Sequence, residues 1–260
     1  MAPARLLLRL AASSLVVVAC AGGAGAPTSP AAASAPAATV VASGSTVPAT
    51  IAPAEGPTAC DHPNYPLRTG ATWTTNNGPG QTIPSTITNV TGDSKQAIAK
   101  LQSTNPSGST FTADILCGPG LAYGDAVYVG TDGKQGTRKR TGGSGMFLPP
   151  AEELVDGRTF SWTMVGAFDM PSYDGSGKFF GQIQYTVELS QDCTVSGPKS
   201  VTLATGAQTG FQVTCTGTRK STDASGKVVV TPSPINLYYL KGIGPSGVDP
   251  GTELVSYSIP

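Results

Sequence analysis

The chain has 260 residues, with 16 basic and 16 acidic side chains and a formal net charge of zero. This balance argues against a nucleic-acid partner, because replacing the counterions of phosphates needs an excess of basic side chains. Only 12% of the residues are charged, and the 33 glycines and 22 prolines favour a turn-rich β protein over a helical bundle.

The N-terminal residues have the pattern of an export signal. Two arginines precede an apolar stretch, about Leu10–Ala19, which is too short for a spanning helix of about 20 apolar residues. The tetrapeptide V-V-A-C that ends at Cys20 resembles the lipobox of bacterial lipoproteins, whose cysteine receives a diacylglycerol and becomes the first residue. We therefore predict a lipoprotein signal peptide over residues 1–19 and a lipid on Cys20. The alternative is an ordinary secretory signal, cut near Ala19 or Ala26.

The segment after Cys20 is almost entirely Ala, Pro, Ser, Thr, Gly and Val up to residue 59, with Glu55 as its one charge. Such a composition cannot bury enough apolar surface to offset the entropy of ordering. Several prolines also argue against a buried helix. We predict that residues 20–59 form a lipidated, disordered tether that holds a folded domain away from a membrane.

Residues 60–260 read as a single β domain. Apolar and polar residues alternate with period two, which predicts antiparallel strands with one buried and one wet face. Turn-forming residues such as Thr131–Lys134 and Ala224–Gly226 lie between the runs. The only helical signal is a single turn near Pro149–Leu154. The residues predicted to share one face of a run are Phe179, Gly181, Ile183, Tyr185, Val187 and Leu189; Phe160, Trp162, Met164 and Phe168; and Phe211, Val213 and Cys215. The closing strands are predicted at Leu237 and Tyr239 and at Val255, Tyr257 and Ile259.

Four cysteines remain once Cys20 is set aside, and an even number in an exported protein predicts disulfides. Cys193 and Cys215 share strand parity with the inward-facing residues of their runs, which favours their pairing. Closing the loop of about 20 residues between them would stabilise the fold by roughly 3 kcal/mol. Cys60 would then pair with Cys117, although the other two connectivities stay open.

Three stretches together resemble a known group of proteins. They are Y-P-L-R-T-G-A-T-W-T at Tyr65–Thr74, F-L-P-P-A-E-E-L-V-D-G at Phe147–Gly157, and the ending Y-Y-L-K-G-I-G…E-L-V-S-Y-S-I-P at Tyr238–Pro260. The set resembles uncharacterised exported bacterial domains, many of them lipoproteins, which are similar to domain-of-unknown-function families with a lipoprotein-carrier-like fold. The resemblance implies an all-β fold with almost no helix, whose strongly curved antiparallel sheet or incomplete barrel surrounds an apolar concavity. It implies no activity.

The residues that carry common chemistries are scarce. His62 is the one histidine, and no two cysteines have C-x-x-C spacing. Ser144 lies in a glycine run that is not G-x-S-x-G, and the adjacent Glu152 and Glu153 would diverge rather than face each other. We therefore expect no enzyme activity, no metal and no cofactor. Lys134, Arg138, Lys139 and Arg140 are interpreted as a solvated hairpin tip that protects a sheet edge, with contact to anionic head groups as the alternative.

The sequence thus predicts a non-catalytic, extracytoplasmic envelope lipoprotein, anchored to the cell membrane by the lipid on Cys20. Its curved sheet would bind an apolar or amphiphilic ligand, such as a lipid, or an envelope protein partner. One alternative is a structural or adhesion-like surface module without a pocket. The other is an Asp/Glu hydrolase that acts on cell-wall glycan.

Overall fold

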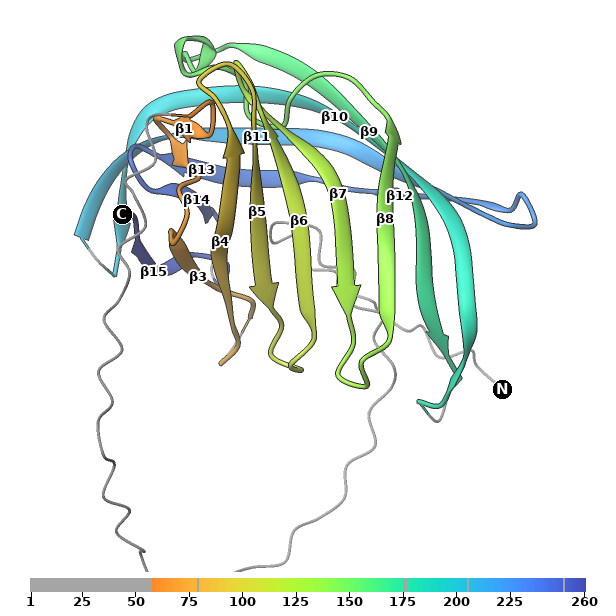
Figure 1. Ribbon diagram of the computed structural model, residues 1–260. Helices are drawn as coiled ribbons and strands as arrows, with labels where there is room; N and C mark the ends of the chain where they lie inside the picture. Colours follow the sequence, from red (N-terminus) through yellow and green to blue (C-terminus); the bar gives the residue numbers. More distant parts are fainter. Residues whose placement is uncertain (1–57, 79, 175–176, 205, 250) are drawn as a thin grey trace, which may run out of the picture.

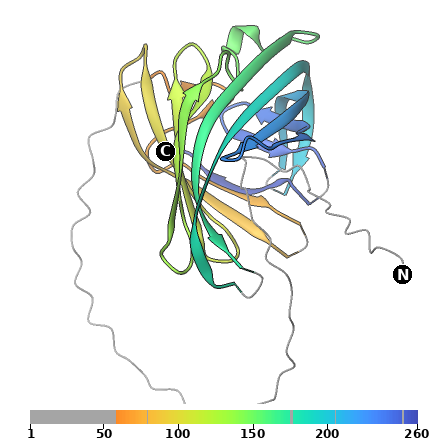
Figure 2. The ribbon, with the colours of Figure 1, turned by 90° about the vertical axis from the view of Figure 1, so that its right-hand side faces the viewer.

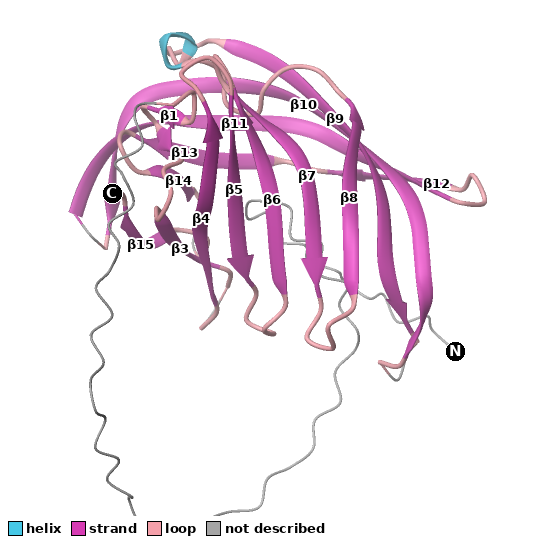
Figure 3. Cartoon of the chain, viewed as in Figure 1, coloured by secondary structure: helices cyan, strands magenta, loops and turns pink. Residues whose placement is uncertain are grey.

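The computed structural model describes residues 58–260, apart from residues 79, 175–176, 205 and 250. The predicted signal peptide, Cys20 and nearly all of the predicted tether lie outside the described residues. Within the described ranges the ordered structure is almost entirely β-strand, and its one helical segment is the 3-10 turn η1 at Ala151–Glu153 (Figure 3). In that same part of the chain, no helix has the length and apolar character needed to cross a membrane.

Fifteen strands follow one another along the described chain. They are β1 Asp61–His62, β2 Tyr65–Pro66, β3 Thr72–Asn76, β4 Thr82–Gly92, β5 Ala97–Thr104, β6 Thr110–Cys117, β7 Leu121–Val129, β8 Gln135–Gly142, β9 Thr159–Tyr173, β10 Phe179–Leu203, β11 Gly206–Asp223, β12 Val228–Pro232, β13 Ile235–Leu240, β14 Gly244–Gly247 and β15 Leu254–Ser258.

The strands form one large antiparallel sheet, and β1 and β2 make a separate small hairpin. Each strand from β3 to β11 pairs with the next strand in the chain. The path then continues through β13 to β14, while the last strand, β15, returns to pair with β3. The sheet curls until its two ends meet, so the strands surround an interior (Figures 1 and 2). The predicted all-β fold, a strongly curved and incompletely closed antiparallel sheet, is confirmed.

The sheet remains open along one seam, between β14 and β15. These two strands lie next to each other, but no backbone ladder joins them within the described residues. One backbone hydrogen bond, from the N–H of Gly247 to the carbonyl of Thr252 just before β15 over 3.2 Å, and two side-chain bonds bridge the gap. The backbone N–H of Leu254 donates to Ser246 Oγ over 3.0 Å, and Trp73 Nε1 donates to the carbonyl of Ile243, just before β14, over 2.6 Å.

Alternation along the long strands gives the barrel its core. On the inner face of β10, Val187, Leu189, Gln191, Cys193 and Val195 are all buried. The residues that alternate with them are exposed, except Ser190, which is half-buried. The period of two places one set of side chains inside and the other in solvent, as the sequence predicts. Toward the start of β10 the same face becomes more exposed, and Ile183 is 43% exposed.

Two disulfides fasten this sheet. Cys193 and Cys215 are directly opposite each other on β10 and β11 and are bonded. Cys60, just before β1, is bonded to Cys117 at the end of β6, across 57 residues of sequence. This is the connectivity that strand parity favours. It ties the β1–β2 hairpin to the wall of the barrel.

The interpretation of the basic residues near 134–140 needs correction. Strand β8 pairs with β7 on one side and β9 on the other, so it is not an edge strand. Its side chains alternate between the two faces of the sheet. Lys139 is exposed, but Arg138 points inward and is only 6% exposed. Arg138 therefore belongs to the interior and not to a solvated, edge-protecting cluster.

Candidate functional site

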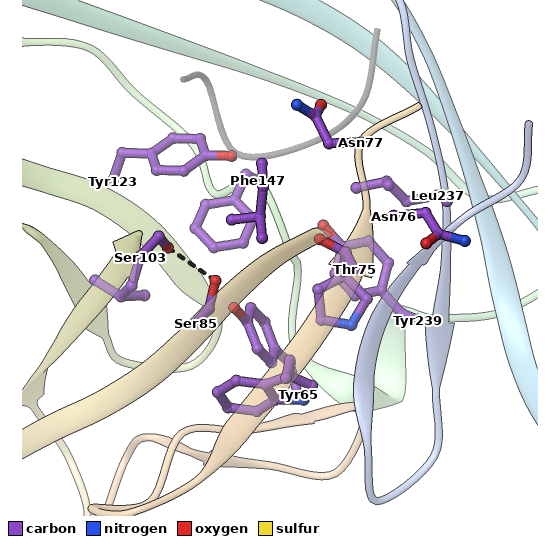
Figure 4. Close-up of a pocket in the computed structure, with 15 residues that line it drawn as sticks. Tyr65, Thr75, Asn76, Asn77, Ser85, Ser103, Tyr123, Phe147, Leu237 and Tyr239 are labelled. Carbon is purple, nitrogen blue, oxygen red and sulfur yellow. Dashed lines mark hydrogen bonds between the residues drawn. The ribbon is translucent and has the colours of Figure 1, made fainter. Parts of the chain in front are cut away.

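A cavity of about 50 Å³ lies inside the barrel beside the seam. Its walls come from β2 to β7 on one side and from β13 and β14 on the other, together with Phe147 from the connection between β8 and β9. Figure 4 shows Tyr123, Phe147 and Ser103 on one side of this space and Leu237 and Tyr239 on the other. A cavity of this volume holds a few water molecules or a small chemical group.

Aromatic rings make up much of the cavity wall. Tyr65 and Trp73 meet edge to face with ring centres 5.3 Å apart, and Tyr123 stacks on Phe147 at 4.3 Å. The backbone comes close to the first pair at Gly244, where an added Cβ would lie 2.9 Å from both Trp73 Nε1 and the Tyr65 ring. Only glycine fits this position, whose φ is also +129°. The close approach of β14 therefore fixes the aromatic corner of the cavity.

Polar groups are few and uncharged. Ser85 on β4 and Ser103 on β5 are cross-strand partners, and their hydroxyls hydrogen-bond over 2.8 Å (Figure 4). Both serines are buried. Asn76, at the end of β3, donates from its side-chain amide to Glu253 Oε2 over 3.1 Å and so is held at the rim. An apolar lining with a small number of placed polar groups is typical of a binding cavity.

Three tyrosines add hydroxyl groups to this lining. Burial raises the pKa of Tyr123 to about 12, and burial also raises the pKa values of Tyr65 and Tyr239. All three side chains are therefore neutral at physiological pH and can donate a hydrogen bond. Within the described residues, no hydrogen bond joins any of these hydroxyls to another side chain or to the backbone.

Arg138 lies against Tyr123 in the interior. Its guanidinium carbon is 5.9 Å from the centre of the Tyr123 ring, and its Nη2 donates to the carbonyl of Gly124 over 3.0 Å. The Nε of Arg138 is buried and has no hydrogen-bond partner. A positive charge therefore lies against Tyr123, a residue of the cavity wall, whereas the residues that line the cavity are uncharged.

The other residues considered from the sequence lie elsewhere. His62 is buried outside the cavity lining, and its Nε2 faces the carbonyl of Pro149 at 3.0 Å. Ser144 hydrogen-bonds to Thr163, and Glu153 pairs with the exposed Arg158. None of these residues lines the cavity. In the described part of the chain, no three His, Cys, Asp or Glu residues are grouped in a way that could hold a metal ion.

Some cavity residues lie in recognisable sequence motifs and others do not. Tyr65 and Trp73 belong to the motif Tyr65–Thr74, which indicates a fold but no binding site. Ser85 and Ser103 carry no local signal, because a serine in an alternating strand usually faces solvent. Comparison with known proteins adds no relative, since no family model, curated protein or solved structure matches this chain.

Proposed function

We propose that this protein is a non-catalytic envelope lipoprotein that binds one end of a small amphiphilic molecule in the cavity beside the seam. The observation that carries the proposal is the cavity itself. It combines the rings of Tyr65, Trp73, Tyr123 and Phe147 with neutral tyrosine hydroxyls for which the described part of the chain provides no hydrogen-bond partner. Rings of this kind bind apolar groups, and the free hydroxyls fix the orientation of a polar end.

The cellular location is part of the same proposal. Two disulfides in a chain of this kind support an oxidising, extracytoplasmic compartment. The lipobox-like sequence at Cys20 supports anchoring by lipid, since two or more acyl chains hold a protein stably on a membrane. Mass spectrometry of the membrane-extracted protein should find a lipidated Cys20 as its first residue. An unmodified N-terminus in the soluble fraction would overturn the anchor.

Ligand binding can be followed by fluorescence, because the chain has two tryptophans and Trp73 lines the cavity. In a Trp162→Phe background, titration with dodecanol should change the emission of Trp73 in a saturable way. Leu237→Phe, which fills part of the cavity, should weaken this binding. Ile235→Phe is the matched control, because Ile235 lies on the same strand and face but does not line the cavity. Equal binding by both variants would place the ligand elsewhere.

A further inference from the structure

Arg138 is an unusual residue to find inside this barrel. It is only 6% exposed, and its side chain packs over Gly166 of β9, where an added Cβ would lie 3.2 Å from Arg138 Cγ. No salt bridge to a carboxylate involves it among the described residues. The exposed Asp125 raises the pKa of Arg138 without a salt bridge, and its carboxylate accepts a hydrogen bond from the backbone N–H of Arg140.

Keeping such a charge in the interior is costly. A buried guanidinium needs an anion or a full set of hydrogen bonds to offset its loss of water. In this structure it has the Gly124 carbonyl and the face of Tyr123, while Nε is unpartnered. Burial lowers the pKa of Arg138, yet an arginine keeps its charge at any physiological pH. The positive charge therefore remains, and among the described residues it has no salt-bridge partner, only the longer-range effect of Asp125.

Tyr123 connects this charge to the cavity. Its ring centre is 5.9 Å from the guanidinium carbon of Arg138, and the same side chain lines the cavity and stacks with Phe147 at 4.3 Å. A cation against the ring makes the phenol a stronger hydrogen-bond donor, and the charge on Arg138 lowers the pKa of Tyr123 against the larger effect of burial. A negatively charged acceptor in the cavity would gain from both the hydroxyl and the charge behind it.

We propose that the cavity selects the anionic, carboxylate-bearing end of an amphiphile, with the Tyr123 hydroxyl as the contacting donor and Arg138 as the positioning residue behind it. This inference rests on the proposed function and adds the charge of the ligand. An aromatic wall alone would also suit a quaternary ammonium group. The unpaired charge of Arg138 disfavours a cation in the same space.

The test compares three probes with the same alkyl chain: dodecanoate, dodecanol and dodecyltrimethylammonium. Binding to the Trp162→Phe protein is followed by Trp73 fluorescence. Dodecanoate should bind more tightly than dodecanol, and dodecyltrimethylammonium most weakly. If dodecanol binds in the cavity but dodecanoate has no advantage, the inference fails while the proposed function stands. If none of the three probes binds, the proposed function fails and the inference falls with it.

Variants separate a role in recognition from a role in folding. Arg138→Met should lower the affinity for dodecanoate by roughly tenfold or more, which is the effect of losing a charge-assisted hydrogen bond. The affinity for dodecanol should be unchanged. Tyr123→Phe removes the contacting hydroxyl, so it should weaken the binding of dodecanoate more than that of dodecanol. Arg138→Lys should restore part of the dodecanoate affinity that Arg138→Met loses. Lys139→Met is the matched control, because it removes the same charge from the exposed face of the same strand. An equal loss for dodecanoate and dodecanol in Arg138→Met would show a purely structural arginine and overturn the inference.

Discussion

Trp73 and Ile243 are joined across the open seam of the barrel: the indole Nε1 donates to the Ile243 carbonyl over 2.6 Å, although 170 residues separate them in the chain. Both residues are buried. The same indole ring forms part of the cavity wall. One side chain therefore closes the sheet and shapes the candidate site.

Replacing Trp73 by Phe should destabilise the protein by about 1–3 kcal/mol, because the buried carbonyl of Ile243 would lose its donor. Urea denaturation measures this change. Trp162→Phe is the control: Trp162 is also buried, but its Nε1 has no hydrogen-bond partner, so its replacement removes no hydrogen bond. A cost for Trp162→Phe as large as that for Trp73→Phe would mean that ring packing, not the hydrogen bond, holds the seam.

Gly244 should tolerate no side chain. An alanine there would place its Cβ 2.9 Å from Trp73 Nε1 and would have to adopt a φ of +129°. We expect Gly244→Ala to cost about 2–4 kcal/mol from strain and displacement together, and to weaken ligand binding as the aromatic corner shifts. Gly226→Ala isolates the backbone effect, because its φ is +82° and nothing lies within 4 Å. Thermal denaturation should rank Gly226→Ala as clearly the milder change.

The two disulfides should contribute unequally. Cys60–Cys117 closes 57 residues and Cys193–Cys215 closes 22, so the loop-entropy model gives about 4 and about 3 kcal/mol. Paired replacements by alanine, Cys60→Ala with Cys117→Ala and Cys193→Ala with Cys215→Ala, avoid burying a new polar group. Urea midpoints of the two double variants give the order. The opposite order would show that native contacts near Cys193 outweigh the entropy of the unfolded chain.

Stability should fall as the pH drops below 6.5, the ordinary pKa of histidine, because burial lowers the pKa of His62 in the folded protein. The folded state binds the proton less well than the unfolded state, so the contribution is complete above pH 6.5 and is lost toward the lowered pKa. The backbone N–H of Asn64 donates to Nδ1 over 3.1 Å, and protonation of Nδ1 would break this bond.

Thermal denaturation between about pH 7 and pH 5 tests this in a chain with one histidine. His62→Gln, which does not titrate, should show a flatter pH profile even if the variant is less stable throughout. The same slope in both proteins would assign the effect to carboxylates.

The strands were predictable because alternation is a local property. Val187, Leu189 and Cys193 of β10 are buried as the period of two predicts, whereas the earlier residues of the same predicted face, from Phe179 to Tyr185, are half-buried or exposed. The closure of the barrel could not be predicted in the same way. It depends on the pairing of β15 with β3, which are far apart in the chain, and no local pattern encodes that pairing. The expected likeness to a lipoprotein-carrier family stays a prediction.

The cavity could not be predicted for the same reason: it is formed by residues that are far apart in the chain. Its walls come from eight strands, so Tyr123, Tyr239 and the Ser85–Ser103 pair become neighbours only after folding. Arg138 was assigned to solvent because it lies in a run of charges, R-K-R. Whether β8 is an edge or an internal strand depends on its neighbours β7 and β9, which its own residues do not reveal.

A cylinder whose strands are all paired cannot change its circumference without breaking a row of backbone hydrogen bonds. Here the rims at β14 and β15 are joined in the described residues by single bonds such as Leu254 to Ser246 and Trp73 to Ile243. Widening at that line would leave all the strand ladders intact. Separating the two edges there would break fewer backbone hydrogen bonds than separating any pair of laddered strands.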